Sequence, residues 1–104
     1  MRLAREYLHA HPADVITLRE LARITGMSMY HLAHTFKAEI GMAPHAYQVQ
    51  LRVLQAKRLL AAGCSAAEAA AECGFYDQAH LTVQFKRRVG VTPGAYARSV
   101  IVCN

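Results

Sequence analysis

The sequence predicts an all-α domain of seven helices, and three observations point to that fold class. Alanine and leucine, which are strong helix formers, supply much of the 54% apolar content. Capping residues and glycines divide the chain into seven segments of helical length. Finally, one arrangement of helix, glycine turn and helix occurs twice, and the second helix of each copy starts at Ser28 or Asp77, 49 positions apart. A repeat met only twice indicates two copies of one supersecondary unit rather than a solenoid.

The first helix is expected at 2–10. Leu3, Tyr7 and Ala10 share one face at helical spacing, which predicts that this face is buried. Pro12 follows the helix, because proline has no backbone N–H and cannot continue it.

A capping box made by Thr17 and Glu20 predicts the start of the second helix. Gly26 suits the left-handed conformation of a tight turn, and Ser28 then caps a third helix that ends at Gly41. The buried side of the second helix is expected to hold Leu18, Leu21, Ala22 and Ile24. Helix, glycine turn and helix is the outline of a helix-turn-helix motif.

A long fourth helix is expected at 44–61, with Pro44 at its first position. Apolar residues occur on two of its sides, which is what a connector packed between two subdomains requires. One stripe is Tyr47, Leu51 and Leu54, and the other is Val49, Val53, Ala56 and Leu60.

The second copy begins with another capping box, Ser65 with Glu68, which opens a helix to about Cys73. A helix like that after Ser28 follows at 77–89, and a short last helix is expected at 93–98. Equivalent pairs in the two copies are Ser28 and Asp77, His31 and His80, Leu32 and Leu81, Phe36 and Phe85, Lys37 and Lys86, Gly41 and Gly90, Pro44 and Pro93, and Tyr47 and Tyr96. The expected organisation is a first helix-turn-helix subdomain at 1–43, a connecting helix at 44–62 and a second subdomain at 63–104.

The charge of the chain favours an acidic partner. Twelve Lys and Arg against seven Asp and Glu give a net charge of +5 and a pI near 9.5. Small basic domains are often nucleic-acid binders, because neutralising phosphates releases counterions. A generic soluble basic protein has the same charge, so charge alone leaves both classes open.

The three cysteines, Cys64, Cys73 and Cys103, are an odd number without CxxC spacing. This pattern favours reduced thiols in a cytoplasmic protein over disulfides or a zinc site. The sequence shows no signal peptide and no apolar run of about 20 residues, so no membrane partner is expected.

Helical projection divides the third and sixth helices into a buried and an outward face, with Phe36 and Phe85 on the buried sides. In a helix-turn-helix the outward face of the second helix enters the major groove. The outward residues are the candidates for base contacts: Tyr30, Ala33, His34, Gln78, Ala79, Thr82 and Val83.

These side chains suit base recognition in different ways. Gln78 can pair bidentately with adenine, and Thr82 can hydrogen-bond a base or contact a thymine methyl. His34 can donate or accept a hydrogen bond, Tyr30 combines a flat apolar surface with a hydroxyl, and the alanines and valine offer apolar contact to thymine methyls. Phosphate contacts are expected from Lys37, Lys86 and Arg87 and from the backbone N–H groups of Leu18 and Ala66. An ordinary solvated face could hold any one of these residues, but their repetition at one spacing favours the groove.

The connecting helix also fits DNA geometry. At about 1.5 Å per residue it is about 27 Å long, so it could hold two recognition helices roughly 34 Å apart, which is one turn of B-DNA. Because the copies are in tandem and carry different outward residues, the DNA site is expected to be asymmetric rather than palindromic.

Metal binding and catalysis find little support. His31 and His34 have an i, i+3 spacing that can chelate, but His31 is repeated as His80, which favours a structural role near the turn. No carboxylate or thiol at a telling spacing completes a ligand set. Cys73 is expected to be a core thiol, since no histidine and orienting residue accompany it. We therefore expect no metal, no cofactor and no enzymatic activity.

A family resemblance rests chiefly on the latter part of the chain, GFYDQAHLTVQFKRRVGVTPGAY. Earlier matching positions are Arg52, Ala56, Leu59 and Leu60. From about 4 to 98 the chain resembles the DNA-binding domain of the AraC/XylS family of bacterial transcription regulators. The resemblance implies two homeodomain-like helix-turn-helix units joined by a long helix, with the helices at about 28–40 and 77–89 inserted into adjacent major grooves of an asymmetric promoter site.

The resemblance also implies roles and partners. It makes the outward residues named above the base-contacting ones, although arginine is common in the family where His34 and Val83 stand, so the guanine-reading residues are missing at both. The implied partners are double-stranded DNA and, for an activator, RNA polymerase. Most members carry a sensor or dimerisation domain, which is expected to be absent from this chain. The alternative function is a basic helical protein-interaction module with degenerate DNA binding.

Overall fold

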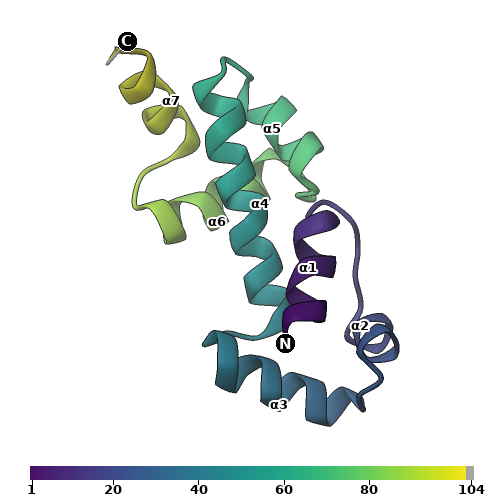
Figure 1. The fold of residues 1–104 in the computed structure, drawn as a ribbon. Helices are drawn as coiled ribbons and strands as arrows, with labels where there is room; N and C mark the ends of the chain where they lie inside the picture. Colours follow the sequence, from purple (N-terminus) through teal and green to yellow (C-terminus); the bar gives the residue numbers. More distant parts are fainter. Residues whose placement is uncertain (103–104) are drawn as a thin grey trace. The chain divides into compact units, whose positions relative to one another are not determined.

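The computed structural model describes residues 1–102 of the chain, with side-chain surroundings for residues 1–100. All regular structure in this range is helical, which confirms the predicted fold class (Figure 1). The helices are α1 (Arg2–Ala10), α2 (Leu18–Thr25), α3 (Met29–Ile40), α4 (Pro44–Ala61), α5 (Ala66–Cys73), α6 (Gln78–Val89) and α7 (Pro93–Val102).

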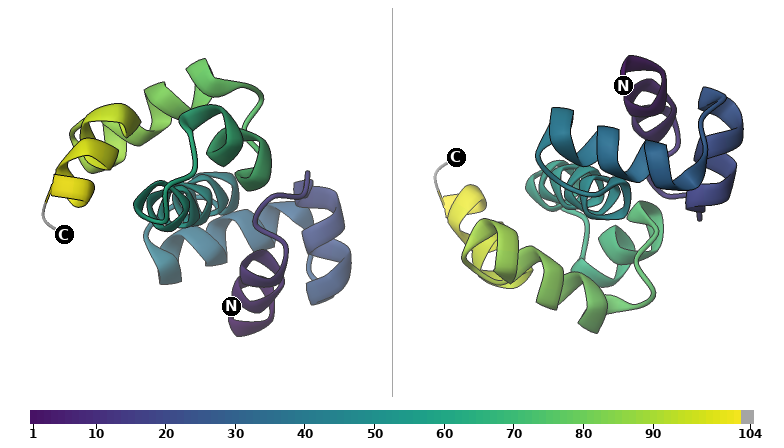
Figure 2. Two further views of the ribbon diagram at one scale, coloured as in Figure 1. Left: turned by 90° about the horizontal axis from the view of Figure 1, so that it is seen from above. Right: turned by 90° about the horizontal axis from the view of Figure 1, so that it is seen from below.

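The chain divides into two compact units, Met1–Val49 and Gln50–Asn104. The division falls inside α4, so this helix gives its beginning to the first unit and its remainder to the second. Within the first unit α2 contacts both α1 and α3, and within the second α6 contacts both α5 and α7 (Figure 1, Figure 2). None of the helices in the range 1–102 is long and apolar enough to cross a membrane.

The buried side of α1 differs from the prediction. Ala4 and Leu8 are buried, whereas Leu3 is 53% exposed, Ala10 is exposed and Tyr7 is only half-buried. In so short a helix two apolar stripes of similar spacing are available, and contact with α2 decides between them. The prediction was therefore wrong: the buried face of α1 is rotated about the helix axis by about one residue from the predicted face.

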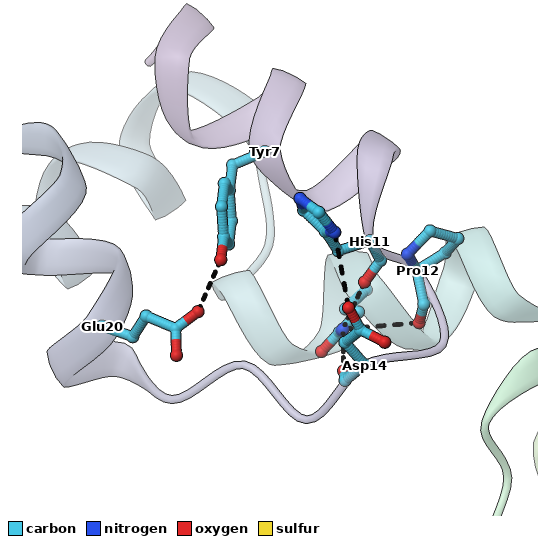
Figure 3. A network of polar contacts seen from close by, with 6 residues as sticks. Tyr7, His11, Pro12, Asp14 and Glu20 are labelled. Atoms are coloured by element: carbon cyan, nitrogen blue, oxygen red, sulfur yellow. Dashed lines mark hydrogen bonds and ion pairs between the residues drawn. The ribbon is translucent and has the colours of Figure 1, made fainter.

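The start of α2 confirms half of the predicted capping box. Thr17 Oγ1 accepts a hydrogen bond from the Glu20 amide at 3.0 Å. The Glu20 carboxylate does not return to Thr17 but accepts from the Tyr7 hydroxyl at 2.7 Å, and this bond raises the pKa of Tyr7 (Figure 3). In the loop between α1 and α2, His11 Nδ1 lies 3.4 Å from a carboxylate oxygen of Asp14.

The loop between α1 and α2 is also held by a buried side chain of α4. Gln48, 2% exposed, donates its side-chain amide to the backbone carbonyls of His11, Pro12 and Asp14, at 3.3, 3.4 and 2.7 Å. A buried amide is costly unless its hydrogen bonds are satisfied, and these carbonyls satisfy it.

Only one of the two stripes predicted on α4 is buried. The stripe from Val49 to Leu60 lies in the core, as predicted, at 4% exposure or less. In the other stripe Tyr47 and Leu51 are half-buried and Leu54 is 46% exposed, so the prediction of a second buried side was wrong. Two polar residues that the pattern did not indicate are buried on this helix, Gln48 and Arg52.

The second unit packs the alanine-rich face of α5 against α6. Its buried apolar residues outside α4 include Ala69, Ala70, Cys73, Phe75, Leu81 and Phe85. Burial raises the pKa of the Cys73 thiol to about 11, which confirms the expected core thiol. The last helix runs to Val102, beyond the end predicted near Arg98.

Candidate nucleic-acid interface

A glycine turn precedes both α3 and α6, and the second turn is one residue longer than the first. Gly26 (φ 71°) and Gly74 (φ 83°) both adopt the left-handed conformation, which a side chain would disfavour. After each turn a side chain accepts the amide of the residue three positions on, Ser28 Oγ at 3.1 Å and Asp77 Oδ1 at 2.8 Å. Both helices therefore start as the sequence predicted.

Aromatic packing fixes which side of α3 and α6 faces outward. Phe36 and Phe85 have no exposed surface. Phe36 meets the ring of Tyr47 on α4 edge-on, and Phe85 meets Tyr96 on α7 in the same way, with centroids 5.6 Å apart in both cases. The opposite sides of α3 and α6 hold the predicted base-contacting residues.

The outer face of α3 (Tyr30, Ala33, His34 and Lys37) is an organised surface. The rings of Tyr30 and His34 lie 4.0 Å apart between centroids, and His34 Nδ1 lies 2.9 Å from the Tyr30 carbonyl oxygen. A carbonyl can only accept, so Nδ1 is the donor in this contact and Nε2 is not engaged by it. Ala33, His34 and Lys37 also line one hollow together. Tyr30 is 74% exposed.

The outer face of α6 (Gln78, Ala79, Thr82, Val83 and Lys86) is less constrained. Gln78, Ala79 and Lys86 are exposed, Val83 is 54% exposed and Thr82 is half-buried. The Thr82 hydroxyl donates to the Gln78 carbonyl at 2.9 Å. Its hydrogen is therefore engaged, and Thr82 is left with an oxygen that can accept and a methyl group.

The expected phosphate ligands divide into side chains and helix starts. Lys37, Lys86 and Arg87 are exposed. Among the described residues none of the three forms an ion pair. Leu18 and Ala66 are the first residues of α2 and α5, where backbone N–H groups have no acceptor within the helix.

The two helix starts have different surroundings. Leu18 and Ala33 line one cavity of about 210 Å³, so this start is brought together with the outer face of α3. Ala66 lies beside Glu68, whose carboxylate accepts from the Ser65 amide at 3.0 Å while Ser65 Oγ accepts the Glu68 amide. These bonds hold the pKa of Glu68 below its ordinary value, and its negative charge opposes phosphate binding next to Ala66.

The turn before α6 holds one residue that sequence reasoning passed over. Tyr76 is 91% exposed and stands directly before the Asp77 cap, where an aromatic ring can contact a ligand of α6. Its backbone amide donates to His80 Nδ1 at 3.2 Å, which confirms the structural role expected of His80. A large aromatic residue before a helix cap was the signal that could have indicated it.

Metal ligands do not cluster in the described part of the chain. No group of three or more His, Cys, Asp or Glu side chains there could hold a metal ion. His34 points its Nδ1 at the Tyr30 carbonyl, and His31 is exposed one turn earlier.

Comparisons with known proteins identify the domain. The model of a helix-turn-helix domain family matches residues 21–99. The uncharacterized helix-turn-helix transcriptional regulator YbfI of Bacillus subtilis is 41% identical over 81 residues, which are 78% of this chain and 30% of YbfI. An AraC-like transcription regulator of Streptomyces antibioticus, itself named as putative, is 35% identical over 96 residues, which are 91% of this chain and 32% of that protein.

A solved structure gives the same result. The DNA-binding domain of the global transcriptional factor AdpA, determined in complex with a target DNA, superposes with a TM-score of 0.85 at 31% identity, over 92% of this chain and 87% of that one. This chain belongs to the helix-turn-helix domain family and, within it, to the DNA-binding domains of the AraC family. It spans about a third of the length of the two relatives named above.

Proposed function

We propose that this chain is the DNA-binding part of a transcription regulator, and that it inserts α3 and α6 into adjacent major grooves of an asymmetric promoter site. Tyr30, Ala33 and His34 would contact bases in one groove. In the other groove the contacts would come from Gln78, Ala79, Thr82 and Val83. Phosphates would be held by Lys37, Lys86 and Arg87 and by the backbone amide of Leu18. The amide of Ala66 would contribute less, because the Glu68 carboxylate lies beside it.

One observation carries the proposal. Both units have a left-handed glycine in the turn, a side-chain cap on the helix that follows and an edge-on aromatic contact, so each presents one helix with a buried apolar side and an exposed outer side. A generic basic surface has no reason to repeat this frame. AdpA, which shares the fold at 31% identity, was solved on its target DNA, and this supports DNA as the ligand of the outer faces.

The details of the two outer faces set the expected recognition. His34 has its Nδ1 engaged by the Tyr30 carbonyl, so the Nε2 atom would meet a base; in the tautomer with its hydrogen on Nδ1 it can accept from the exocyclic amine of adenine or cytosine. Gln78 offers both a donor and an acceptor, the pair that adenine matches. Val83 offers only apolar surface, which suits a thymine methyl group.

The bound domain would act as an activator by contacting RNA polymerase. This part of the proposal, like a binding rather than an enzymatic role, rests on family membership.

A selection of bound sites from random duplex DNA, followed by gel shifts at several salt concentrations, tests the proposal. Lys37→Ala and Lys86→Ala should each weaken binding to all sequences and flatten the salt dependence by about one unit of slope. Arg5→Ala, at an exposed position of α1 outside both faces, is the matched control and should change neither quantity.

Base readers should behave differently from phosphate ligands. Tyr30→Ala and Gln78→Ala should relax preference at particular base pairs, by about 1–3 kcal/mol each, with little effect on the salt slope. Inverting one half of the selected site should abolish specific binding if the site is asymmetric. Unchanged DNA affinity in all four variants would instead favour the protein-interaction module.

A further inference from the structure

The Gln50–Asn104 unit carries a second surface of apolar and basic side chains, and none of its residues belongs to the proposed DNA contacts. Two adjoining hollows of about 420 and 350 Å³ share Leu54 and Lys57 of α4. Tyr96 of α7 lines the first, and Arg88 at the end of α6 lines the second. We call this surface the basic groove; its defining residues are Leu54, Lys57, Arg58, Ala61, Arg88 and Tyr96.

The floor of the basic groove is apolar. Leu54 and Ala61 are seven residues apart, about two helical turns, so they lie along one face of α4. Leu54 is 46% exposed, although the sequence pattern marks it as a residue for burial. Exposed apolar surface rimmed by charge is typical of a site that a partner covers.

The rim of the basic groove is cationic. Within the described residues no carboxylate lies within ion-pair distance of Lys57, Arg58 or Arg88. Two of these cations are held in place by uncharged groups. Lys57 Nζ lies 5.6 Å from the centre of the Tyr96 ring, and Arg88 donates to the side-chain oxygen of Gln84. Positive charge is thus placed around the apolar floor, and none of these three cations has an ion-pair partner among the residues that the structure describes.

The basic groove is separate from the outer face of α6. Arg88 follows the buried Phe85 by three positions, so it lies toward the packed side of the helix, whereas Ala79 and Val83 lie on the opposite side. A ligand in the groove therefore need not displace DNA from α6.

From these contacts we propose that the basic groove docks an acidic amphipathic helix of a protein partner. Apolar side chains of that helix would cover Leu54 and Ala61, and its flanking carboxylates would pair with Lys57, Arg58 and Arg88. The stretch of α4 from Gln50 to Ala61 spans about 16 Å at about 1.5 Å per residue, which matches roughly three turns of a bound helix. A phosphate backbone would use the rim but leave the apolar floor exposed, so charge and apolarity together favour the peptide.

Fluorescence anisotropy with the full 104-residue chain tests this proposal. The probe is a labelled peptide of about 14 residues with leucines at helical spacing and glutamates beside them. A second peptide has the same composition, with its leucines scattered around the helix. The first should bind saturably and the second about tenfold more weakly or not at all.

Variants locate the binding. Leu54→Ser and Arg58→Glu should each weaken peptide binding by about tenfold. Val91→Ser, at a residue of similar exposure (43%), and Arg87→Glu, an exposed cation outside the groove, are the matched controls and should bind the peptide normally. Circular dichroism of each variant confirms that the fold is retained.

Measuring DNA binding of the same variants distinguishes the groove from the proposed phosphate contacts. Leu54→Ser and Arg58→Glu should keep the DNA affinity that Arg87→Glu loses. The docking proposal is overturned if neither peptide binds, if both bind equally, or if the groove variants leave peptide binding intact. It is also overturned if Arg58→Glu weakens DNA binding as much as Arg87→Glu does, since the groove would then hold phosphate.

Discussion

The two helix-turn-helix units share a frame and differ in what they place around it. In both, a left-handed glycine, a side-chain cap and an edge-on aromatic pair orient the second helix. In the first unit α1 precedes the motif. The Tyr7 hydroxyl of α1 donates to the Glu20 carboxylate, which therefore does not complete the capping box with Thr17. In the second unit Glu68 stays in the capping box with Ser65. The same local pattern therefore gives different contacts when a neighbouring helix offers a better donor.

The outer faces differ more than the frame does. His34 is oriented by the Tyr30 carbonyl and ring, whereas Val83 at the equivalent position is a freely exposed apolar side chain. A duplicated frame with divergent outer faces is the arrangement expected for a domain that recognises an asymmetric site.

The largest effect is expected from the aromatic residues at the centre of each frame. Phe36→Ala and Phe85→Ala should each lower the free energy of unfolding by about 3–5 kcal/mol, because both rings are fully buried and leave a cavity. Urea denaturation followed by circular dichroism measures this. Equal losses support equivalent frames, whereas a loss below about 1.5 kcal/mol for one variant would show that its unit tolerates the cavity.

Arginine at the divergent positions should give the next largest effect. His34→Arg and Val83→Arg should each add a preference for guanine at one base pair, about 1–3 kcal/mol over the other bases, because a guanidinium matches the two guanine acceptors. Site selection should place these two positions in different halves of the site. Ala71→Arg, at an exposed position of α5, adds charge alone and should strengthen binding without a new base preference. If all three variants behave alike, α3 and α6 are not the base-reading helices.

Removing the caps should have a smaller effect that is similar in both units. Thr17→Ala and Ser65→Ala each delete one acceptor of a helix amide, bonded at 3.0 and 3.1 Å, and each should cost about 1 kcal/mol. Thermal unfolding detects the change. A much larger loss for Ser65→Ala would mean that the complete box of the second unit is cooperative.

The smallest effect concerns the pH dependence of that box. Because hydrogen bonds hold the pKa of Glu68 below its ordinary 4.5, the ionised carboxylate stabilises the folded state. This contribution is fully present above pH 4.5 and is lost as the pH falls through the lower folded value. The melting temperature of Glu68→Ala should therefore lie below that of the parent chain at neutral pH and approach it as the pH falls below the lowered pKa of the folded state. A gap that is constant from neutral to acid pH would contradict the role of the charge.

Local chemistry predicted the helices and their caps well. Caps and glycines act on the next few residues, so Ser28, Asp77 and the glycine turns could be read from the sequence alone. A structural role was predicted for both His31 and His80 from their equivalent positions, and the bond to the Tyr76 amide confirms it for His80. The exposed side chain of His31 has no corresponding hydrogen bond within the described residues.

Contacts between distant segments could not be predicted in the same way. The choice of Ala4 and Leu8 over Leu3 depends on α2, and the burial of Gln48 depends on carbonyls more than thirty residues earlier in the chain. Leu54 has the spacing of a core residue, but it is 46% exposed to solvent. The candidate base contacts remain a prediction, because exposure shows which side chains a ligand can reach and not which one it meets.

Gln48 has a consequence of its own. Its two amide hydrogens are offered to three carbonyl oxygens of the loop between α1 and α2. Glutamate has nearly the same shape, yet an oxygen in place of that nitrogen would set a carboxylate against those carbonyls and turn attraction into repulsion. Glutamine and glutamate differ here by a single heavy atom, and only the nitrogen of glutamine can donate the hydrogen bonds that hold the loop between α1 and α2 against α4.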